Sequence, residues 1–289
     1  MGHMTEQFTI FEMGPRDGLQ NEKRLISTDD KVRLVDRLSD CGLTKIEVTS
    51  FVSPKWVPQM ADAADVMAGI HRARDVIYSA LTPNMRGLEA ALEAKSDEVA
   101  VFASASEGFS QANINCSIDE SLARFAPVME AAKSVGTPVR GYVSCVIACP
   151  YDGDIAPDQV AYVTAQLLDM GCYEVSLGDT IGVGTPESVT SLLDVLCDRF
   201  AADQLAGHFH DTNGQARDNI KVALDYGLRT FDAAVAGLGG CPYAPGAKGN
   251  VATEQVVAML HDMVFDTGVD LDRLTEVADF ARGLVINDL

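Results

Sequence analysis

The chain has 289 residues, 47% of them hydrophobic and 22% charged, which is the composition of an ordinary globular protein. Its formal net charge of −20 argues against binding to nucleic acid or to anionic membrane surfaces, and no apolar run reaches the roughly 18 residues of a membrane helix. The seven cysteines form no CxxC pair, so we expect mostly buried thiols in a reducing compartment.

Short β-rich apolar runs alternate with longer amphipathic stretches along the chain. The expected strands are 8–13, 44–51, 76–81, 98–105, 139–148, 172–178, 205–210 and 229–236. The expected helices are 29–41, 60–70, 86–95, 117–135, 157–170, 186–202, 216–226 and 252–264, followed by an extra C-terminal helix over 270–284. Eight strand–helix units indicate a parallel sheet, and eight strands close a (β/α)8 TIM barrel. An open doubly wound sheet is the alternative.

The ends of the expected helices carry specific residues. Thr185 is placed as an N-cap with Pro186 at the first helical position. Glycines that follow helical stretches are expected to adopt a left-handed conformation, at Gly42, Gly136, Gly171 and Gly227. Gly2 and His3 resemble an expression remnant, so residues 1–3 are set aside and 4–289 are predicted to form one α/β domain. About 250 residues suffice for such a barrel.

Two histidines end the seventh expected strand, at the face where barrel enzymes bind their substrates. His208 and His210 are two residues apart, so both imidazoles point to the same side of the strand. Strand 1 neighbours strand 8 in a closed barrel, and strand 8 neighbours strand 7. Asp17 and the loop 238–250 are therefore expected beside the histidines, where Asn250 can add an amide oxygen. Nitrogen and oxygen ligands without a thiolate suit Mg2+ or Mn2+, whereas the alternative is a purely structural His-x-His pair.

Further polar residues at this face have two interpretations each. Arg16 is either half of a weak surface ion pair or a cation directed at an oxygen that becomes negative. Cys241 is either a buried thiol or a proton donor on the glycine-rich loop 238–250, which is typical of a lid. Glu47 and Asp179 either orient metal ligands or are satisfied polar groups inside the barrel.

Six segments together resemble the 3-hydroxy-3-methylglutaryl-CoA lyase family over nearly the whole chain. They are GPRDGLQNEK (14–23), IEVTSFVSPKWVPQMAD (46–62), RGYVSC (140–145), EVSLGDTIGVGTP (174–186), HFHDTNGQA (208–216) and GLGGCPYAPGAKGNVATE (237–254). The last segment is the specific one, because the RDG and HxHD elements occur more widely among metal-dependent barrel lyases and Claisen-type synthases.

The resemblance implies a divalent-metal-dependent cleavage of (S)-3-hydroxy-3-methylglutaryl-CoA to acetoacetate and acetyl-CoA, as in leucine degradation and ketone-body formation. By position it implies the metal ligands Asp17, His208, His210 and Asn250, the catalytic residues Arg16 and Cys241, a base at His208 or Asp17, and supporting acids at Glu47 and Asp179. The residues expected to bind the acyl-CoA substrate are Arg16, Gln20, Lys23, Arg140 and Lys248, with Lys55 a further candidate for the CoA phosphates. A bacterial, cytoplasmic enzyme and a homodimer are expected from the family.

Three alternatives stay open on the sequence. The first is a lyase for a longer 3-hydroxy-3-alkylglutaryl-CoA, because Lys248, Asn213 and Gly108 depart from the usual family residues. The second is a Claisen-type synthase that joins an acyl-CoA to a 2-oxo acid. The third is a barrel that binds metal or acyl-CoA without turnover.

Overall fold

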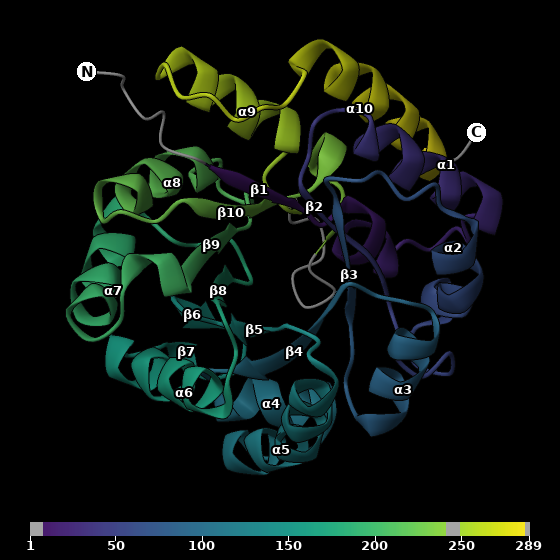
Figure 1. Cartoon of the computed structure of the whole chain (residues 1–289). Helices are drawn as coiled ribbons and strands as arrows, with labels where there is room; N and C mark the ends of the chain where they lie inside the picture. Colours follow the sequence, from purple (N-terminus) through teal and green to yellow (C-terminus); the bar gives the residue numbers. More distant parts are fainter. Residues whose placement is uncertain (1–7, 241–248, 287–289) are drawn as a thin grey trace.

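The computed structural model describes residues 8–240 and 249–286, and in these residues the eight expected strands close into one barrel (Figure 1). The strands are parallel, in the spatial order β1, β10, β9, β8, β5, β4, β3, β2. Their bounds are β1 Thr9–Glu12, β2 Lys45–Ser50, β3 Ile77–Leu81, β4 Glu98–Ser104, β5 Val139–Ser144, β8 Val175–Asp179, β9 Leu205–Phe209 and β10 Thr230–Ala233. Because β1 pairs with both β2 and β10, the open-sheet alternative is wrong.

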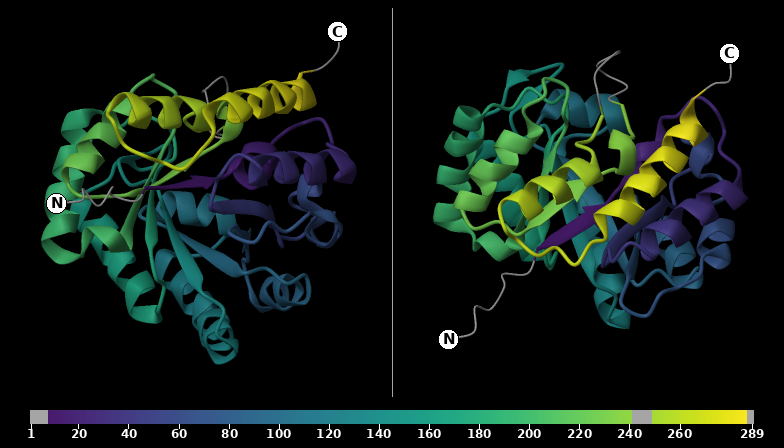
Figure 2. Two further views of the ribbon diagram at one scale, coloured as in Figure 1. Left: turned by 45° about the horizontal axis from the view of Figure 1, so that its top comes forward. Right: turned by 90° about the horizontal axis from the view of Figure 1, so that it is seen from above.

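Helices surround the barrel in a ring (Figures 1 and 2). Their bounds are α1 Thr28–Ser39, α2 Ala63–Gly69, α3 Met85–Glu93, α4 Glu107–Ile114, α5 Ile118–Val135, α6 Pro157–Met170, α7 Pro186–Arg199, α8 Ala216–Asp225, α9 Thr253–Asp262 and α10 Leu271–Val285. The extra C-terminal helix is confirmed as α10, which lies against α1 and closes the ring beside β1. None of the helices in the described ranges is long and apolar enough to cross a membrane.

The predicted helix boundaries are confirmed by the local chemistry. Thr185 accepts a hydrogen bond from the backbone N–H of Ser188 and caps α7, with Pro186 in the first turn. Gly42, Gly136, Gly171 and Gly227 all have positive φ, between 75° and 108°. At Gly42 a Cβ would also lie 2.2 Å from the carbonyl oxygen of Gly268, so a larger residue is excluded there on two grounds.

Three local predictions were wrong. Helix α4 was missed, because its short polar sequence has only weak amphipathic periodicity; Ser106 caps it by accepting from Phe109 N. The strand expected over 139–148 ends at Ser144, since Cys145 has φ of +61° and its N–H donates to Thr180 Oγ1. Ala148 therefore belongs not to the barrel strand but to a small antiparallel hairpin that was not predicted, β6 Ala148–Cys149 with β7 Gly153–Asp154.

Two apolar layers stabilise the barrel. The large core lies between the outer strand faces and the helices, as with Val99, Leu192 and Leu224. A smaller cluster fills the barrel interior, where Phe11, Met13, Leu81, Ala100 and Tyr142 pack together. The cysteines of the described ranges fit the expected burial, Cys197 alone being partly exposed. Polar groups inside the barrel are thus enclosed by hydrocarbon, which strengthens their electrostatic interactions.

Candidate metal centre and active site

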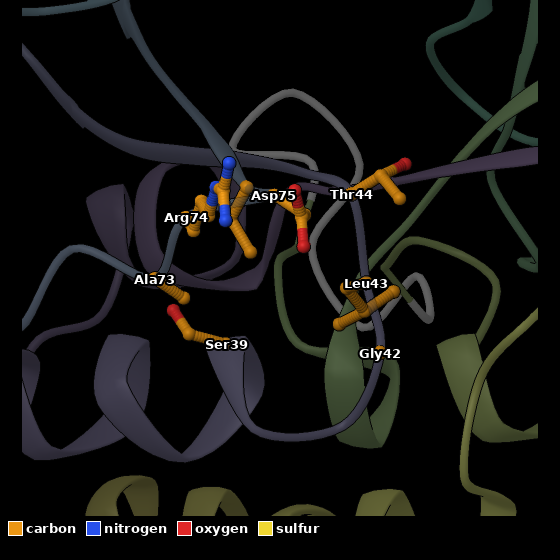
Figure 3. A pocket seen from close by; sticks show the side chains of 8 residues that line it. Ser39, Gly42, Leu43, Thr44, Ala73, Arg74 and Asp75 are labelled. Atoms are coloured by element: carbon orange, nitrogen blue, oxygen red, sulfur yellow. The ribbon is translucent and has the colours of Figure 1, made fainter.

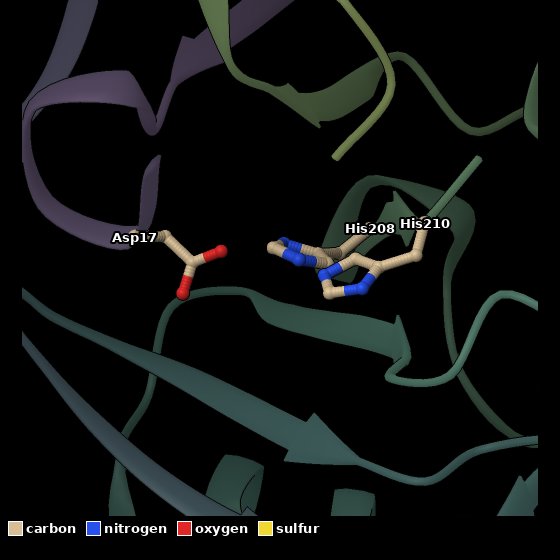
Figure 4. Close-up of side chains that lie close together, drawn as sticks. All are labelled: Asp17, His208 and His210. Atoms are coloured by element: carbon tan, nitrogen blue, oxygen red, sulfur yellow. The ribbon is translucent and has the colours of Figure 1, made fainter. Parts of the chain in front are cut away.

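Asp17, His208 and His210 converge at the carboxyl-terminal mouth of the barrel. Each offers one ligand atom, and these three atoms lie within 4.8 Å of one another. The Asp17 carboxylate points at the two imidazoles, whose ring centroids are 5.3 Å apart (Figure 4). The predicted neighbourhood is confirmed, because β10 lies between β1 and β9 in the barrel.

A π-helical turn over Gly14–Gly18, directly after β1, presents Asp17. At Gly14 a Cβ would lie 2.6 Å from Glu12 Oε1, and at Gly18 it would lie 2.8 Å from Leu238 Cβ. Only glycine fits these two close approaches, so the Gly-Pro-Arg-Asp-Gly segment is a consequence of packing the turn against the barrel and against Leu238.

Asn250 lies beside the triad because residue 250 forms an isolated antiparallel bridge with His210. Its Nδ2 donates to Asp17 Oδ2 at 2.8 Å and to the carbonyl oxygen of Leu238 at 3.1 Å. Among the described residues, no group hydrogen-bonds to Asn250 Oδ1 or to His210 Nδ1, although both atoms are buried. Buried acceptors without partners are costly, so this pair fits a site that binds a cation.

The charge states of Asp17 and His210 also suit a divalent cation. Burial raises the pKa of Asp17, but Arg16 and the two histidines outweigh burial and lower that pKa to about 2. Burial, followed by the charge of His208, lowers the pKa of His210 to about 4. At neutral pH the site therefore presents a carboxylate and a neutral imidazole, the forms that bind metal.

Arg16 lies between two carboxylates at the same mouth. Its Nε donates to Glu47 Oε2 and its Nη1 donates to Asp17 Oδ1 at 2.7 Å. The side chain is 7% exposed, so the surface-pair interpretation does not describe it. Burial lowers the pKa of Arg16, but Glu47 and Asp17 outweigh burial and raise it, which keeps a permanent cation beside the metal ligands.

The other predicted residues have diverse environments. Gln20 donates to Asp17 Oδ1 at 3.1 Å, and Lys23 is exposed on the loop that follows the π turn. Asp179 accepts from the backbone N–H groups of Val183 and Gly184, so it holds the loop after β8 and fits the interpretation as a satisfied polar group. Cys241 and Lys248, with most of the expected lid, lie outside the described residues.

Arg140 does not lie where a substrate contact was predicted. It is fully buried inside the barrel, where its guanidinium donates to Asp232 and Glu174. That assignment is corrected: a side chain enclosed by the barrel and paired with two carboxylates is not available to substrate.

Sequence reasoning missed Asp232 and Tyr142. Asp232 Oδ2 accepts from the Nδ1 side of His208 at 3.0 Å, and the Tyr142 hydroxyl donates to Glu47 Oε1 at 3.1 Å. The signal for Asp232 was present, since a carboxylate in the apolar run 229–236 needs a buried partner. Pairing across the barrel could not be read from the sequence, because Arg140 and Asp232 are 92 residues apart.

Glu12, also missed, anchors the π turn from outside the barrel wall. Its Oε1 accepts from the backbone N–H groups of Gly14 and Val235, and its Oε2 accepts from the Thr253 hydroxyl. Burial raises the pKa of Glu12 from 4.5 to about 7. The folded state therefore binds more protons than the unfolded state, and this group lowers stability as the pH rises from about 4.5 to about 7.

Replacing Glu12 with glutamine removes this titration and keeps the three contacts possible. We compare the free energy of unfolding of Glu12→Gln with that of the parent. As the pH rises from about 5 to about 8, this difference should change by roughly 2 kcal/mol in favour of the variant. Urea unfolding of both proteins at the two pH values measures this change. A stability difference that is the same at both values would contradict the assignment.

One hollow lies at the opposite end of the barrel from the mouth. It is lined by Ser39, Gly42, Leu43, Thr44, Ala73, Arg74, Asp75 and Val76, where β2 and β3 begin (Figure 3). Because barrel enzymes bind substrate at the carboxyl ends of the strands, this hollow is no part of the site.

The fold and the site define a (β/α)8 barrel enzyme with a candidate divalent-metal centre at its mouth. The HMGL-like family matches residues 7–281, and the chain belongs to that family. This confirms the resemblance predicted from the sequence.

Three relatives show how close the match is. The chain is 58% identical over 274 residues to 3-hydroxy-3-isohexenylglutaryl-CoA/hydroxy-methylglutaryl-CoA lyase of Pseudomonas aeruginosa, covering 95% of this chain and 91% of the relative. The crystal structure of HMG-CoA lyase from Brucella melitensis has a TM-score of 0.96 and 61% identity, covering 97% of this chain and 99% of that one. An HMG-CoA lyase from Acinetobacter baumannii, in complex with coenzyme A and 3-methylmalate, has a TM-score of 0.93 and 36% identity over 99% and 93% of the two chains.

Proposed function

We propose that this protein is a divalent-metal-dependent lyase that cleaves (S)-3-hydroxy-3-methylglutaryl-CoA to acetoacetate and acetyl-CoA. The observation that carries the proposal is the convergence of Asp17, His208 and His210 beside the buried cation Arg16. Relatives of more than 50% identity are named as lyases for this substrate, which supports the same activity here.

The chain's own groups supply the remaining chemistry. Asp17, His208, His210 and Asn250 would hold Mg2+ or Mn2+, whose role is to lower the pKa of the substrate's tertiary hydroxyl and polarise a neighbouring oxygen. The hydroxyl proton passes to His208 or Asp17, and the carbon–carbon bond breaks to leave acetoacetate and a thioester enolate. Arg16 stabilises the negative oxygen of that enolate. The Cys241 thiol then returns a proton to the enolate carbon, which yields acetyl-CoA.

The CoA moiety needs cations in a protein whose net charge is −20. We assign Lys23, Lys55 and Lys248 to its phosphates, since Lys23 and Lys55 are exposed on the loops that follow β1 and β2. The relative solved in complex with coenzyme A supports an acyl-CoA ligand. The homodimer expected from the family stays a prediction.

A longer-chain substrate is the second candidate, because the name of the Pseudomonas relative includes 3-hydroxy-3-isohexenylglutaryl-CoA. Gly108, one of the unusual positions, has a local role: its backbone N–H donates to Asp152 Oδ2 at 2.8 Å and so ties the hairpin to α4, and a Cβ there would lie 2.4 Å from Oδ1 of the same carboxylate. It therefore gives no evidence for a larger acyl pocket. Comparing kcat/KM for the methyl and isohexenyl substrates decides between the two lyases.

Removing the metal should abolish activity. We expect acetoacetate release from 3-hydroxy-3-methylglutaryl-CoA with excess Mg2+ or Mn2+, loss of at least 100-fold with EDTA, and recovery when the metal is restored, because the hydroxyl is a poor acid without it. Turnover unaffected by EDTA would overturn the metal requirement. A second outcome would also contradict the proposal. If the folded, metal-binding protein cleaves neither the methyl nor the isohexenyl substrate, but releases CoA from acetyl-CoA and a 2-oxo acid, the protein is a synthase and not a lyase.

A further inference from the structure

A continuous set of buried hydrogen bonds runs beneath the candidate metal centre, and Arg140 lies at its middle. Arg140 is on β5, across the barrel interior from β10, and none of its side chain reaches solvent. Its Nε donates to Glu174 Oε1 at 2.7 Å, and its guanidinium carbon lies 4.5 Å from the centre of the Phe11 ring. These contacts hold the guanidinium plane and direct the other two nitrogens toward Asp232 and Tyr142.

The first branch leads from Arg140 to the metal ligand His208. Arg140 Nη1 and Nη2 donate to the two Asp232 oxygens, at 3.1 Å and 2.8 Å. The Ser176 hydroxyl donates to Asp232 Oδ2 at 2.7 Å, and that same oxygen lies 3.0 Å from His208 Nδ1. Because Arg140 and Ser176 already donate to the Asp232 carboxyl oxygens, Asp232 accepts the proton of His208 Nδ1. The lone pair of the His208 ring is therefore on Nε2, where it is available to coordinate a metal ion.

The second branch leads from Arg140 to the other half of the site. Arg140 Nη1 also donates to the Tyr142 hydroxyl at 3.2 Å, and that hydroxyl donates to Glu47 Oε1 at 3.1 Å. Glu47 Oε2 accepts from Arg16 Nε, and Arg16 Nη1 donates to Asp17 Oδ1. Four hydrogen bonds in series therefore connect Arg140 to the metal ligand Asp17. The last of them is donated by Arg16, the side chain that we propose stabilises the enolate.

We propose that Arg140 is a positioning residue for both halves of the site. Its hydrogen bonds to Asp232 hold His208 in place. Its hydrogen bond to Tyr142, and that of Tyr142 to Glu47, hold Arg16 and Asp17 in place. Arg140 touches neither substrate nor metal. The inference deepens the proposed function, but its first branch concerns metal binding alone and can be measured without any substrate.

The two branches predict different results for two conservative variants. In Asp232→Asn the amide can donate to His208 Nδ1, which moves the imidazole proton to Nε2 and blocks the metal's ligand atom. We expect Mn2+ affinity of the purified protein, measured by calorimetric titration, to fall about 10- to 100-fold. In Tyr142→Phe only a hydroxyl is lost, so Mn2+ affinity should stay within about 3-fold while kcat falls about 10-fold at little change in KM.

Glu174→Gln is the matched control. It also converts a carboxylate that contacts Arg140 into an amide, but the amide oxygen can still accept from Arg140 Nε and the side chain lies on neither branch, so Mn2+ affinity and kcat should both stay within about 3-fold of the parent. Thermal unfolding of every variant checks that the barrel is intact. If Asp232→Asn does not fold, Arg140→Lys replaces it, because an ammonium cannot bond both Asp232 oxygens and Tyr142 in the same geometry; it should weaken Mn2+ binding and lower kcat together.

The outcomes separate this inference from the proposed function. Parent-like Mn2+ affinity in folded Asp232→Asn, or equal losses of affinity in Tyr142→Phe and Asp232→Asn, would overturn the two-branch arrangement. So would a Glu174→Gln variant with the same loss of Mn2+ affinity as Asp232→Asn. If the parent protein fails to cleave the substrate, the proposed reaction falls, and the Mn2+ titrations still decide the branch through Asp232.

Discussion

Asp17→Asn is expected to weaken Mg2+ or Mn2+ binding by at least 100-fold and to lower kcat by about 1,000-fold or more. Asp17 supplies the single carboxylate of the triad, and a neutral amide oxygen attracts a hard divalent cation much less. The substitution keeps the shape of the side chain and removes the charge that pairs with Arg16. Metal titration and steady-state rates at saturating metal measure the two effects.

An exposed carboxylate provides the control for this prediction. Asp262→Asn, at the end of α9, makes the same chemical change far from the mouth and should leave metal affinity and kcat unchanged. If Asp17→Asn bound metal as tightly as the parent, Asp17 would not be a ligand. Recovery of kcat at high metal concentration would show that its role is confined to binding the cation.

Arg16→Gln is expected to lower kcat by about 100- to 1,000-fold and to leave metal affinity within a few-fold of the parent. Arg16 is the buried cation beside the triad, and it stabilises charge that appears only as the carbon–carbon bond breaks. Its loss also leaves Glu47 and Asp17 without their partner, which we expect to lower the free energy of unfolding by about 3 kcal/mol. Rates, metal titration and urea unfolding measure the three quantities separately.

Two further variants sharpen the test of Arg16. Arg24→Gln removes an exposed arginine eight positions along the chain and should change none of the three quantities. Arg16→Lys keeps the charge but cannot donate to Glu47 and Asp17 with the same planar geometry, so its kcat should lie between those of the parent and Arg16→Gln. A parent-like kcat for folded Arg16→Gln would remove Arg16 from the enolate step.

Sequence patterns alone were enough to predict the barrel and the convergence of Asp17, His208 and His210. The alternation of β-rich and amphipathic runs gave all eight strands, because each strand must bury apolar residues against the helices that flank it. Spacing placed His208 and His210 on one face, and the order of strands in a closed barrel brought Asp17 beside them. The positions of Arg16 and Asn250 follow from the same reasoning. Arg16 precedes Asp17 in the sequence, and Asn250 lies on the segment beside His210 in the barrel.

The groups that orient the site could not be predicted, because their contacts join strands that are distant in the sequence. The sequence suggested Arg140 as a candidate substrate cation, but its partners are Asp232, on β10, and Glu174, directly before β8. Helix propensity and strand periodicity report the environment of a residue relative to its own element. They carry no information on which side chains meet across the barrel axis. The hydrogen bonds and ion pairs that fix the atoms of His208 and Arg16 lie inside the barrel, where a low dielectric constant strengthens them.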